Sequence, residues 1–169
     1  MTTVRPVCPE QDATAVAEVS VAAWRVAYAG VMPHEYLDAR DPARLAEGMR
    51  RAWEDPERTE RVLVAEQEGR VVGFAVHGPD RDGPASTGEL VAINVHPDVF
   101  GTGVGTRLLA AAKEELRGAG FARAVLWVVP ANARARRFYV REGWTHDGVD
   151  RSTTLQGITI DVTRYSREL

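Results

Sequence analysis

VHPDVFGTGVGTRLL, residues 95–109, is the stretch of this sequence that decides the fold. It joins the end of an apolar run, residues 90–95, to a helical pattern through glycines at every second position. Because glycine lacks a Cβ atom, its backbone can approach an anion closely and adopt positive φ. The free N–H groups at the start of the following helix point at the same place. The stretch therefore predicts a strand, a phosphate-binding loop and a helix in succession.

The spacing of the glycines separates this loop from two familiar nucleotide motifs. The dinucleotide fingerprint requires G-x-G-x-x-G after a first strand and an acidic residue about 20 positions later. Here the order is G-x-G-x-G, and it comes late in the chain. A nucleoside triphosphate loop requires a lysine directly after its last glycine, and none follows here. An unrelated nucleotide-binding domain is thus disfavoured, while a glycine-rich turn without a ligand stays open for the stretch taken alone.

Composition limits the classes of protein that the chain can represent. With 169 residues, 44% of them hydrophobic, we expect a single domain over residues 1–169 with a sizeable core. A net charge of −3 gives no electrostatic case for binding nucleic acid or an anionic membrane, and we expect neither as a partner. Four arginines do cluster in one short helical segment. These residues are Arg134, Arg136, Arg137 and Arg141. They indicate either a solvated helix face or contacts to phosphate.

Cysteine usage and hydropathy favour a cytoplasmic protein without a metal centre. The single cysteine, Cys8, cannot form an internal disulfide, and no group of Cys and His residues has the spacing of metal ligands. The first residues lack the apolar core of a signal peptide, and no run approaches the roughly 20 apolar residues of a membrane span. We therefore expect a cytoplasmic location and no metal.

Hydrophobic periodicity predicts alternating strands and helices. The expected strands cover residues 2–7, 61–67, 70–77, 89–95, 122–129, 144–146 and 155–164. The expected helices cover residues 12–28, 42–53, the segment from the glycine loop to Gly118, and 133–141. Asn132 is well placed to cap the last of these helices. The order of the elements predicts an α/β fold built on a mixed sheet.

Two motifs in this order resemble those of the GCN5-related N-acetyltransferase (GNAT) superfamily. The first is ELVAINV at 89–95, followed by Pro97 and the G-x-G-x-G turn; the second is NARARRFY at 132–139, followed by EGW at 142–144. Together they cover roughly the C-terminal half of the core. A third segment, with Trp24, Tyr28 and the residues up to Leu37, is similar to the N-terminal part of many members that act on small molecules.

The resemblance implies a mostly antiparallel sheet with one splayed pair of parallel strands, helices on both faces, and acetyl-CoA as acyl donor. Main-chain groups of Ile93, Asn94 and Val95 would hold the pantetheine arm and the acetyl carbonyl. The pyrophosphate would lie on the loop and helix start formed by Gly101, Thr102, Gly103, Val104, Gly105 and Thr106. Asn132 would contact the pantetheine as well as cap its helix.

At one position the sequence departs from the family pattern. Phe100 stands directly before the first glycine, where members usually carry Arg or Gln. A polar contact to phosphate is therefore missing, and Arg107 and Arg134 are candidates to replace the charge.

The family pattern also assigns catalytic roles, each of which has a structural alternative. Tyr139 would protonate the departing thiolate as general acid, or it is a core tyrosine. Glu89, at the start of its strand, would deprotonate the amine directly or through water, or it is an ordinary charge at a strand end. Trp24 and Tyr28 would wall the acceptor pocket by cation–π contact, although their i, i+4 spacing equally fits a core stripe.

The leading interpretation is an acetyl-CoA-dependent N-acetyltransferase that transfers the acetyl group directly to a primary amine of a small molecule, such as a polyamine, an amino acid or a drug-like amine. A transferase acting on a protein N-terminus is an alternative. A non-catalytic acyl-CoA-binding module is another, and Phe100 is the residue that favours it. A homodimer is possible, because such domains often pair through their C-terminal strands.

Overall fold

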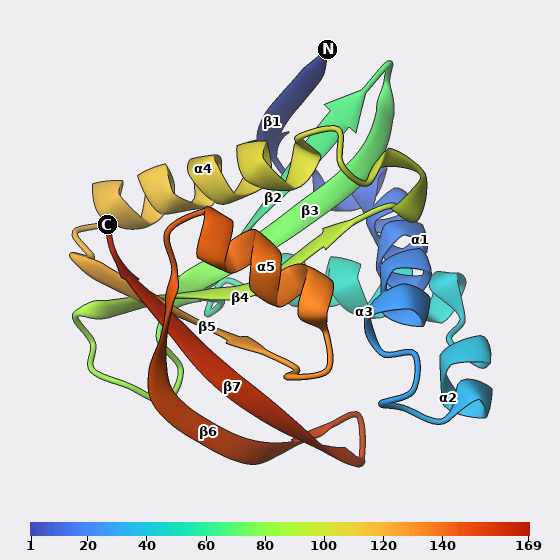
Figure 1. The fold of residues 1–169 in the computed structure, drawn as a ribbon. Helices are drawn as coiled ribbons and strands as arrows, with labels where there is room; N and C mark the ends of the chain where they lie inside the picture. Colours follow the sequence, from blue (N-terminus) through green and yellow to red (C-terminus); the bar gives the residue numbers. More distant parts are fainter.

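The computed structural model describes residues 1–169, and Figure 1 shows one sheet covered by helices on both faces. Seven strands are arranged in the order β1-β2-β3-β4-β5-β7-β6. The strands are β1 (Thr2–Pro6), β2 (Arg61–Gln67), β3 (Arg70–Pro79), β4 (Thr87–Val95), β5 (Arg123–Val128), β6 (Thr145–Leu155) and β7 (Ile158–Glu168). The pair β4 and β5 is parallel and every other neighbouring pair is antiparallel. The expected mixed, mostly antiparallel sheet is confirmed.

The helices are divided between the two faces of this sheet (Figure 1). They are α1 (Pro9–Ala27), α2 (His34–Asp38), α3 (Pro42–Trp53), α4 (Val104–Gly118) and α5 (Ala133–Arg141), with a short 3₁₀ turn at Pro97–Val99. Apolar side chains of α4 and α5 pack against one face in the largest core cluster. Side chains of α1 and α3 pack against the other face in two smaller clusters. None of these helices is long and apolar enough to cross a bilayer.

The parallel strands β4 and β5 pair along only part of their length. Residues 87–90 face residues 123–126, and β4 then continues to Val95 without β5 beside it. A bulge lies at this point, because Val76 of β3 faces Ala92 while the next residue, His77, faces Leu90. Bulges bend a strand and increase its twist. The two parallel strands therefore separate, and the β4 main chain beyond Leu90 has an unpaired edge.

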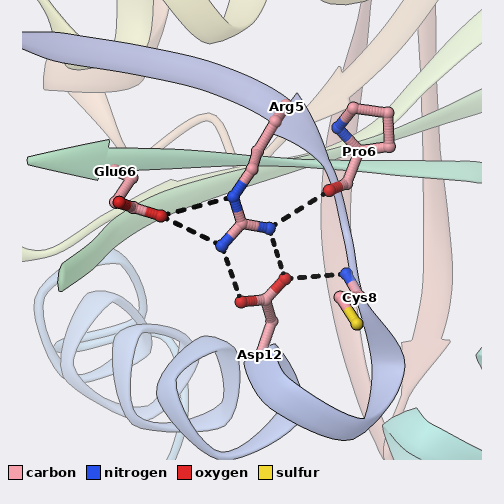
Figure 2. Close-up of polar contacts among 5 residues, drawn as sticks. All are labelled: Arg5, Pro6, Cys8, Asp12 and Glu66. Carbon is pink, nitrogen blue, oxygen red and sulfur yellow. Dashed lines mark hydrogen bonds and ion pairs between the residues drawn. The ribbon is translucent and has the colours of Figure 1, made fainter. Parts of the chain in front are cut away.

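Helix α1 begins three residues earlier than the sequence predicts, because polar groups close its first turn. Pro9 occupies the first helical position, where its missing N–H costs nothing. The Asp12 carboxylate accepts the Cys8 N–H at 2.7 Å and two hydrogen bonds from Arg5 of β1, at 2.7 and 2.9 Å. Arg5 also binds Glu66 of β2 (Figure 2). This cluster ties the first strand, the second strand and the start of α1 together.

The C-terminal strands are much longer than the predicted 144–146 and 155–164. They form one hairpin closed by Gln156 and Gly157, both with positive φ. The pattern was missed because β6 is an edge strand with alternating exposed polar residues, so its sequence reads as a loop. The helix α2 was also not predicted, because its five residues carry too little periodicity.

Candidate active site

The glycine loop folds into a cradle whose shape requires glycine at two positions. Gly101 and Gly103 have φ of 78° and 88°, in the left-handed region, with open space where a Cβ would lie. Gly103 is the N-cap of α4, and the first intrahelical bond runs from Arg107 N–H to its carbonyl. The N–H groups of Val104, Gly105 and Thr106 therefore have no carbonyl partner within the helix. Together they make a concave surface suited to an anion.

A cleft of about 580 Å³ opens beside this cradle. It is bounded by the unpaired end of β4, the glycine loop, the start of α4, one face of α5, and Ala23 and Ala27 at the end of α1. The predicted cofactor residues that line it are Ile93, Asn94, Val95, Gly101, Gly103, Val104, Gly105, Thr106 and Asn132. Thr102 does not line the cleft, because its hydroxyl donates to the Val99 carbonyl at 2.8 Å and closes the turn. The structure thus brings together nearly all of the predicted donor site.

Phe100, the residue that departs from the family pattern, holds an arginine in this cleft. The guanidinium carbon of Arg134 lies 3.3 Å from the centre of the Phe100 ring, and both residues line the cleft. Arg134 has no hydrogen-bond or ion-pair partner, and burial lowers the pKa of its guanidinium. A cation stacked on an aromatic ring keeps its N–H edge free for an anion. The ring therefore replaces the missing polar side chain indirectly, by positioning a charge from α5.

The four arginines of α5 divide into two groups. Arg134, Arg137 and Arg141 follow each other at i, i+3 and i+7 and all line the cleft. Arg136 points elsewhere and donates to the Tyr165 hydroxyl and the Pro130 carbonyl, both at 3.2 Å. One face of the helix is therefore positively charged toward the cleft. The other candidate, Arg107, does not line it.

Tyr139 lies at the bottom of the cleft and is 7% exposed. Its ring packs at the edge of Trp144 and belongs to the main core cluster, so the residue is both a core tyrosine and part of the cleft. Its hydroxyl has no hydrogen-bond partner within the protein. Burial, and the nearby Tyr28 to a lesser extent, raise the pKa of Tyr139 well above its usual range. The phenol therefore stays protonated at neutral pH and can donate into the cleft.

Asn132 caps α5 as the sequence predicts. Its side-chain oxygen accepts the Ala135 N–H at 3.1 Å, and the residue lines the cleft. The N-cap is confirmed, and because it uses only the oxygen, the amide NH₂ remains available to a ligand.

The structure does not bring Glu89 into the cleft. It lies in the part of β4 that is still paired with β5, and it is 1% exposed. Its carboxylate accepts three hydrogen bonds from Arg81: from the backbone N–H at 3.2 Å, from Nε at 3.0 Å and from Nη2 at 2.6 Å. Both carboxylate oxygens therefore accept hydrogen bonds from Arg81, in the loop that connects β3 to β4. The sequence could not show this, because Arg81 belongs to a stretch without a motif.

Trp24 and Tyr28 face a second region, which we call the aromatic face. Their ring centres are 4.6 Å apart, and they pack on a cluster formed by the segment after α1 with strands β5 and β7. The buried members of that cluster are Met32, Leu37, Val129, Ile160 and Val162. Trp127 of β5 lies at its border with the Arg151 guanidinium over its ring, at 3.9 Å. Neither Trp24 nor Tyr28 lines the cleft itself, but Tyr28 is close enough to shift the pKa of Tyr139.

No three His, Cys, Asp or Glu side chains converge in the way that metal ligands do. The groups of the cleft that can bind or protonate a ligand are its main-chain N–H and C=O groups, its arginines and Tyr139.

A partly separated parallel strand pair beside a glycine cradle and a short arginine-bearing helix defines the class of N-acetyltransferase folds. A model of the Acetyltransferase (GNAT) family matches residues 21–144. The chain belongs to this family.

Relatives and solved structures agree with this assignment. The uncharacterized N-acetyltransferase YuaI of Bacillus subtilis is 31% identical over 123 residues, which are 72% of this chain and 69% of the relative. A mycothiol acetyltransferase of Stackebrandtia nassauensis is 34% identical over 148 residues, which are 85% of this chain but 44% of that protein. The chain thus spans less than half the length of the mycothiol acetyltransferases that it matches.

Among solved structures, the PaiA N-acetyltransferase of Thermoplasma acidophilum in complex with coenzyme A has a TM-score of 0.77 at 19% identity, over 100% of this chain and 99% of that one. YncA of Salmonella typhimurium with acetyl-CoA has a TM-score of 0.71 at 23% identity, over 99% of this chain and 94% of that one. At these identities the likeness concerns the fold, and it confirms the α/β architecture expected from the sequence.

Proposed function

We propose that the protein is an acetyl-CoA-dependent N-acetyltransferase that transfers the acetyl group directly to a primary amine of a small molecule. The observation that carries this proposal is the convergence in one cleft of three elements: an unpaired β4 edge, a glycine cradle at a helix start, and an unbonded Tyr139 hydroxyl. Solved relatives of this fold hold coenzyme A or acetyl-CoA, which supports the donor.

The cleft fits the donor by shape and by charge. The cradle of residues 101–106 offers main-chain N–H groups to the pyrophosphate, and Arg134 adds a cation beside it. The unpaired main chain of residues 93–95 offers hydrogen bonds to the pantetheine arm and to the thioester carbonyl, which polarise the carbonyl carbon. The amide NH₂ of Asn132 completes the pantetheine contacts. Bound in this way, acetyl-CoA supplies an activated acetyl group.

Tyr139 acts as the general acid in this proposal. A bond forms between the amine nitrogen and the carbonyl carbon while the carbon–sulfur bond breaks, and the sulfur takes the phenolic proton. Tyr139 regains a proton from solvent. Because burial raises the pKa of Tyr139, the phenol is protonated at working pH and acts here as a proton donor and not as a base.

The proton lost by the amine passes to water in this proposal, without direct abstraction by Glu89. The carboxylate of Glu89 is bound to Arg81 and buried in the paired region of β4. The residue holds the β3–β4 connection against the sheet. Cys8 is the one cysteine of the chain and begins α1 far from the cleft lining, so the transfer passes through no acetylated cysteine.

Trp24 and Tyr28 form the acceptor wall in this proposal. Each directly follows an alanine of α1 that lines the cleft, Ala23 or Ala27, and aromatic rings can hold either an ammonium or an apolar body. The names of the relatives include a mycothiol acetyltransferase and a PaiA N-acetyltransferase, so the family alone does not choose the acceptor.

The test is a panel of primary amines incubated with acetyl-CoA, with free coenzyme A measured by a thiol reagent and the acetylated amine by mass spectrometry. We expect release of coenzyme A that depends on the amine. Binding of acetyl-CoA, seen as a rise in Tm, without acetylation of any amine or peptide N-terminus would instead favour an acyl-CoA-binding module. A Tm raised by ATP or NAD but not by acetyl-CoA would overturn the donor.

A further inference from the structure

One arginine on the aromatic face has no counter-charge. Arg40 follows α2, and its guanidinium carbon lies 3.7 Å from the centre of the Trp24 ring. Its Nη2 donates to the hydroxyl of Ser20, at 3.4 Å, the hydroxyl of Tyr36 lies near the guanidinium, and its Nε is buried without a hydrogen-bond partner. No carboxylate lies within ion-pair distance of it. The side chain is partly buried, so its charge is shielded from water without being neutralised.

Three arginines of the β3–β4 loop and the C-terminal hairpin are paired, in contrast to Arg40. Arg81 binds Glu89 at 2.6 Å, Arg151 binds Asp82 at 2.9 Å, and Arg164 binds Asp147 at 2.8 Å. Arg151 also stacks on a tryptophan, as Arg40 does, yet it has a carboxylate partner. Stacking on an aromatic ring therefore does not account for the missing partner of Arg40.

Arg40 is connected with the reaction centre through the acceptor wall. It stacks on Trp24, whose ring contacts Tyr28, and Tyr28 is close enough to affect the pKa of both Arg40 and Tyr139. Burial lowers the pKa of the Arg40 guanidinium, and the Tyr36 hydroxyl opposes this shift only in part. A half-buried cation of this kind is stabilised when an anion of a ligand reaches it. The anion would lie at the far end of an acceptor whose amine points toward Tyr139.

We propose that Arg40 binds a carboxylate of the acceptor, so that the substrate is a primary amine that carries a carboxylate group. This inference rests on the proposed acetyltransferase function and specifies its substrate class. Trp24 holds the guanidinium flat, so that the terminal N–H groups not used by Ser20 can form a charge-assisted contact. A free amino acid or an ω-amino acid has this chemistry, whereas a polyamine has the wrong charge for this site.

The experiment uses a series of ω-amino acids from glycine to 6-aminohexanoate, each with its matching carboxamide, at saturating acetyl-CoA. In the wild type we expect one spacing of amine and carboxylate to give the highest kcat/KM. Arg40→Gln should lower kcat/KM for that acid at least tenfold and change that of its amide less than twofold. The different basicities of acid and amide cancel, because each probe is compared between wild type and variant.

Two further variants separate charge from structure. Arg40→Lys should keep part of the preference for the acid, because it keeps the charge but loses the flat fork. Arg44→Gln removes an exposed arginine of α3 that has no partner, and it should leave kcat/KM for both the acid and the amide unchanged. A Tm of Arg40→Gln within a few degrees of wild type shows that the variant is folded.

Binding of the same probes to the complex with coenzyme A, measured by calorimetry, distinguishes this inference from the function on which it rests. If the acid binds, loses affinity in Arg40→Gln and is never acetylated, the carboxylate contact of Arg40 stands and the proposed transfer is wrong. If amines are acetylated but acid and amide respond equally to Arg40→Gln, the transfer stands and the carboxylate is wrong. Equal rates of polyamine acetylation in wild type and Arg40→Gln, with no turnover of any acid, would also overturn the proposed carboxylate contact of Arg40.

Discussion

The donor cleft and the aromatic face both present an arginine stacked on an aromatic ring, but they are built differently. In the cleft, Arg134 on Phe100 supplements main-chain groups of a single continuous segment, the glycine loop with the end of β4. On the aromatic face, Arg40 on Trp24 belongs to a surface made only of side chains, from α1, the segment after it, and strands β5 and β7. On the proposed function, donor binding would depend mainly on backbone shape, whereas acceptor choice would depend on side chains that distant segments bring together.

The largest effect on turnover is expected from substitution of Tyr139. Tyr139→Phe removes the proton donor but keeps the ring in the core, so turnover should fall by about 100-fold or more. The Kd for coenzyme A, measured by calorimetry, should change less than twofold. An unchanged turnover would remove Tyr139 from the mechanism and leave it as a core residue of α5.

The pH dependence gives an independent check on the same residue. Because burial raises the pKa of Tyr139 above the usual value of about 10, its acidic form persists up to that pH. The wild-type turnover should therefore show no fall between about pH 7 and 10. A decline at mildly alkaline pH that is absent from Tyr139→Phe would show that the pKa is not raised.

Substitutions in the stacked pair of Phe100 and Arg134 test the binding of coenzyme A. Arg134→Ala should raise the Kd for coenzyme A about tenfold, because it removes a charged contact to phosphate. Phe100→Ala should raise it about threefold, since Arg134 remains but is no longer held. The double variant should resemble Arg134→Ala alone, because the two residues act together.

A matched control for the donor side is Arg50→Ala, on the opposite face of the sheet, which should leave the Kd unchanged. Strictly additive effects of Phe100→Ala and Arg134→Ala would mean that the ring does not position the guanidinium. In that case the main-chain cradle would bind the phosphates without help from residue 100.

A smaller effect on the reaction is expected from Glu89→Gln. If the proton of the amine passes to water, turnover should fall less than threefold and its pH profile should keep its shape. The Tm should fall by several degrees, because the amide loses the ionic contact to Arg81. A fall in turnover as large as that expected for Tyr139→Phe, with an altered acidic limb of the pH profile, would instead make Glu89 the base.

The polar cluster at the start of α1 should affect stability and leave the reaction unchanged. Asp12→Asn is expected to lower the free energy of unfolding by about 2 kcal/mol, which corresponds to a Tm lower by roughly 4 to 8 °C. The hydrogen bonds from Arg5 lower the pKa of Asp12, so the stability that its ionised form provides is present above the unfolded-state pKa of about 3.9. This stability is lost as the pH falls through the lower pKa of the folded state.

Thermal melts of wild type and Asp12→Asn from strongly acidic to neutral pH measure this difference. The gap between the two curves should be constant at neutral pH and close in acid. A turnover changed by more than twofold in the variant would show that the cluster communicates with the cleft.

The sequence was sufficient for the local geometry of the proposed donor site, because that geometry depends on neighbouring residues within each segment. Gly101, Gly103 and Asn132 have roles that follow from local backbone geometry, and the structure confirms positive φ at the two glycines and the N-cap at Asn132. The strand before the loop and the helix after it were predicted from periodicity alone. Each of these inferences needed only neighbouring residues.

The sequence was insufficient where partners come from distant segments. The ion pair of Glu89 with Arg81, the stack of Arg134 on Phe100 and the position of Arg40 over Trp24 join residues that share no periodic pattern. Most of β6 beyond residue 146 was not predicted for a related reason, since its polar residues are held by pairing with β7 and not by burial. Loop and edge positions therefore had to come from the structure.

The separation of β4 and β5 has a consequence for how this protein can be altered. With the donor held as we propose, mainly by the main chain at one end of the opening, the side chains of Trp24, Tyr28, Tyr36 and Arg40 can be exchanged without changing a residue that lines the cleft. In this proposal, substrate range and acetyl donation depend on different parts of the chain. A library confined to Trp24, Tyr28, Tyr36 and Arg40 would explore new acceptors on a scaffold whose cosubstrate handling stays constant.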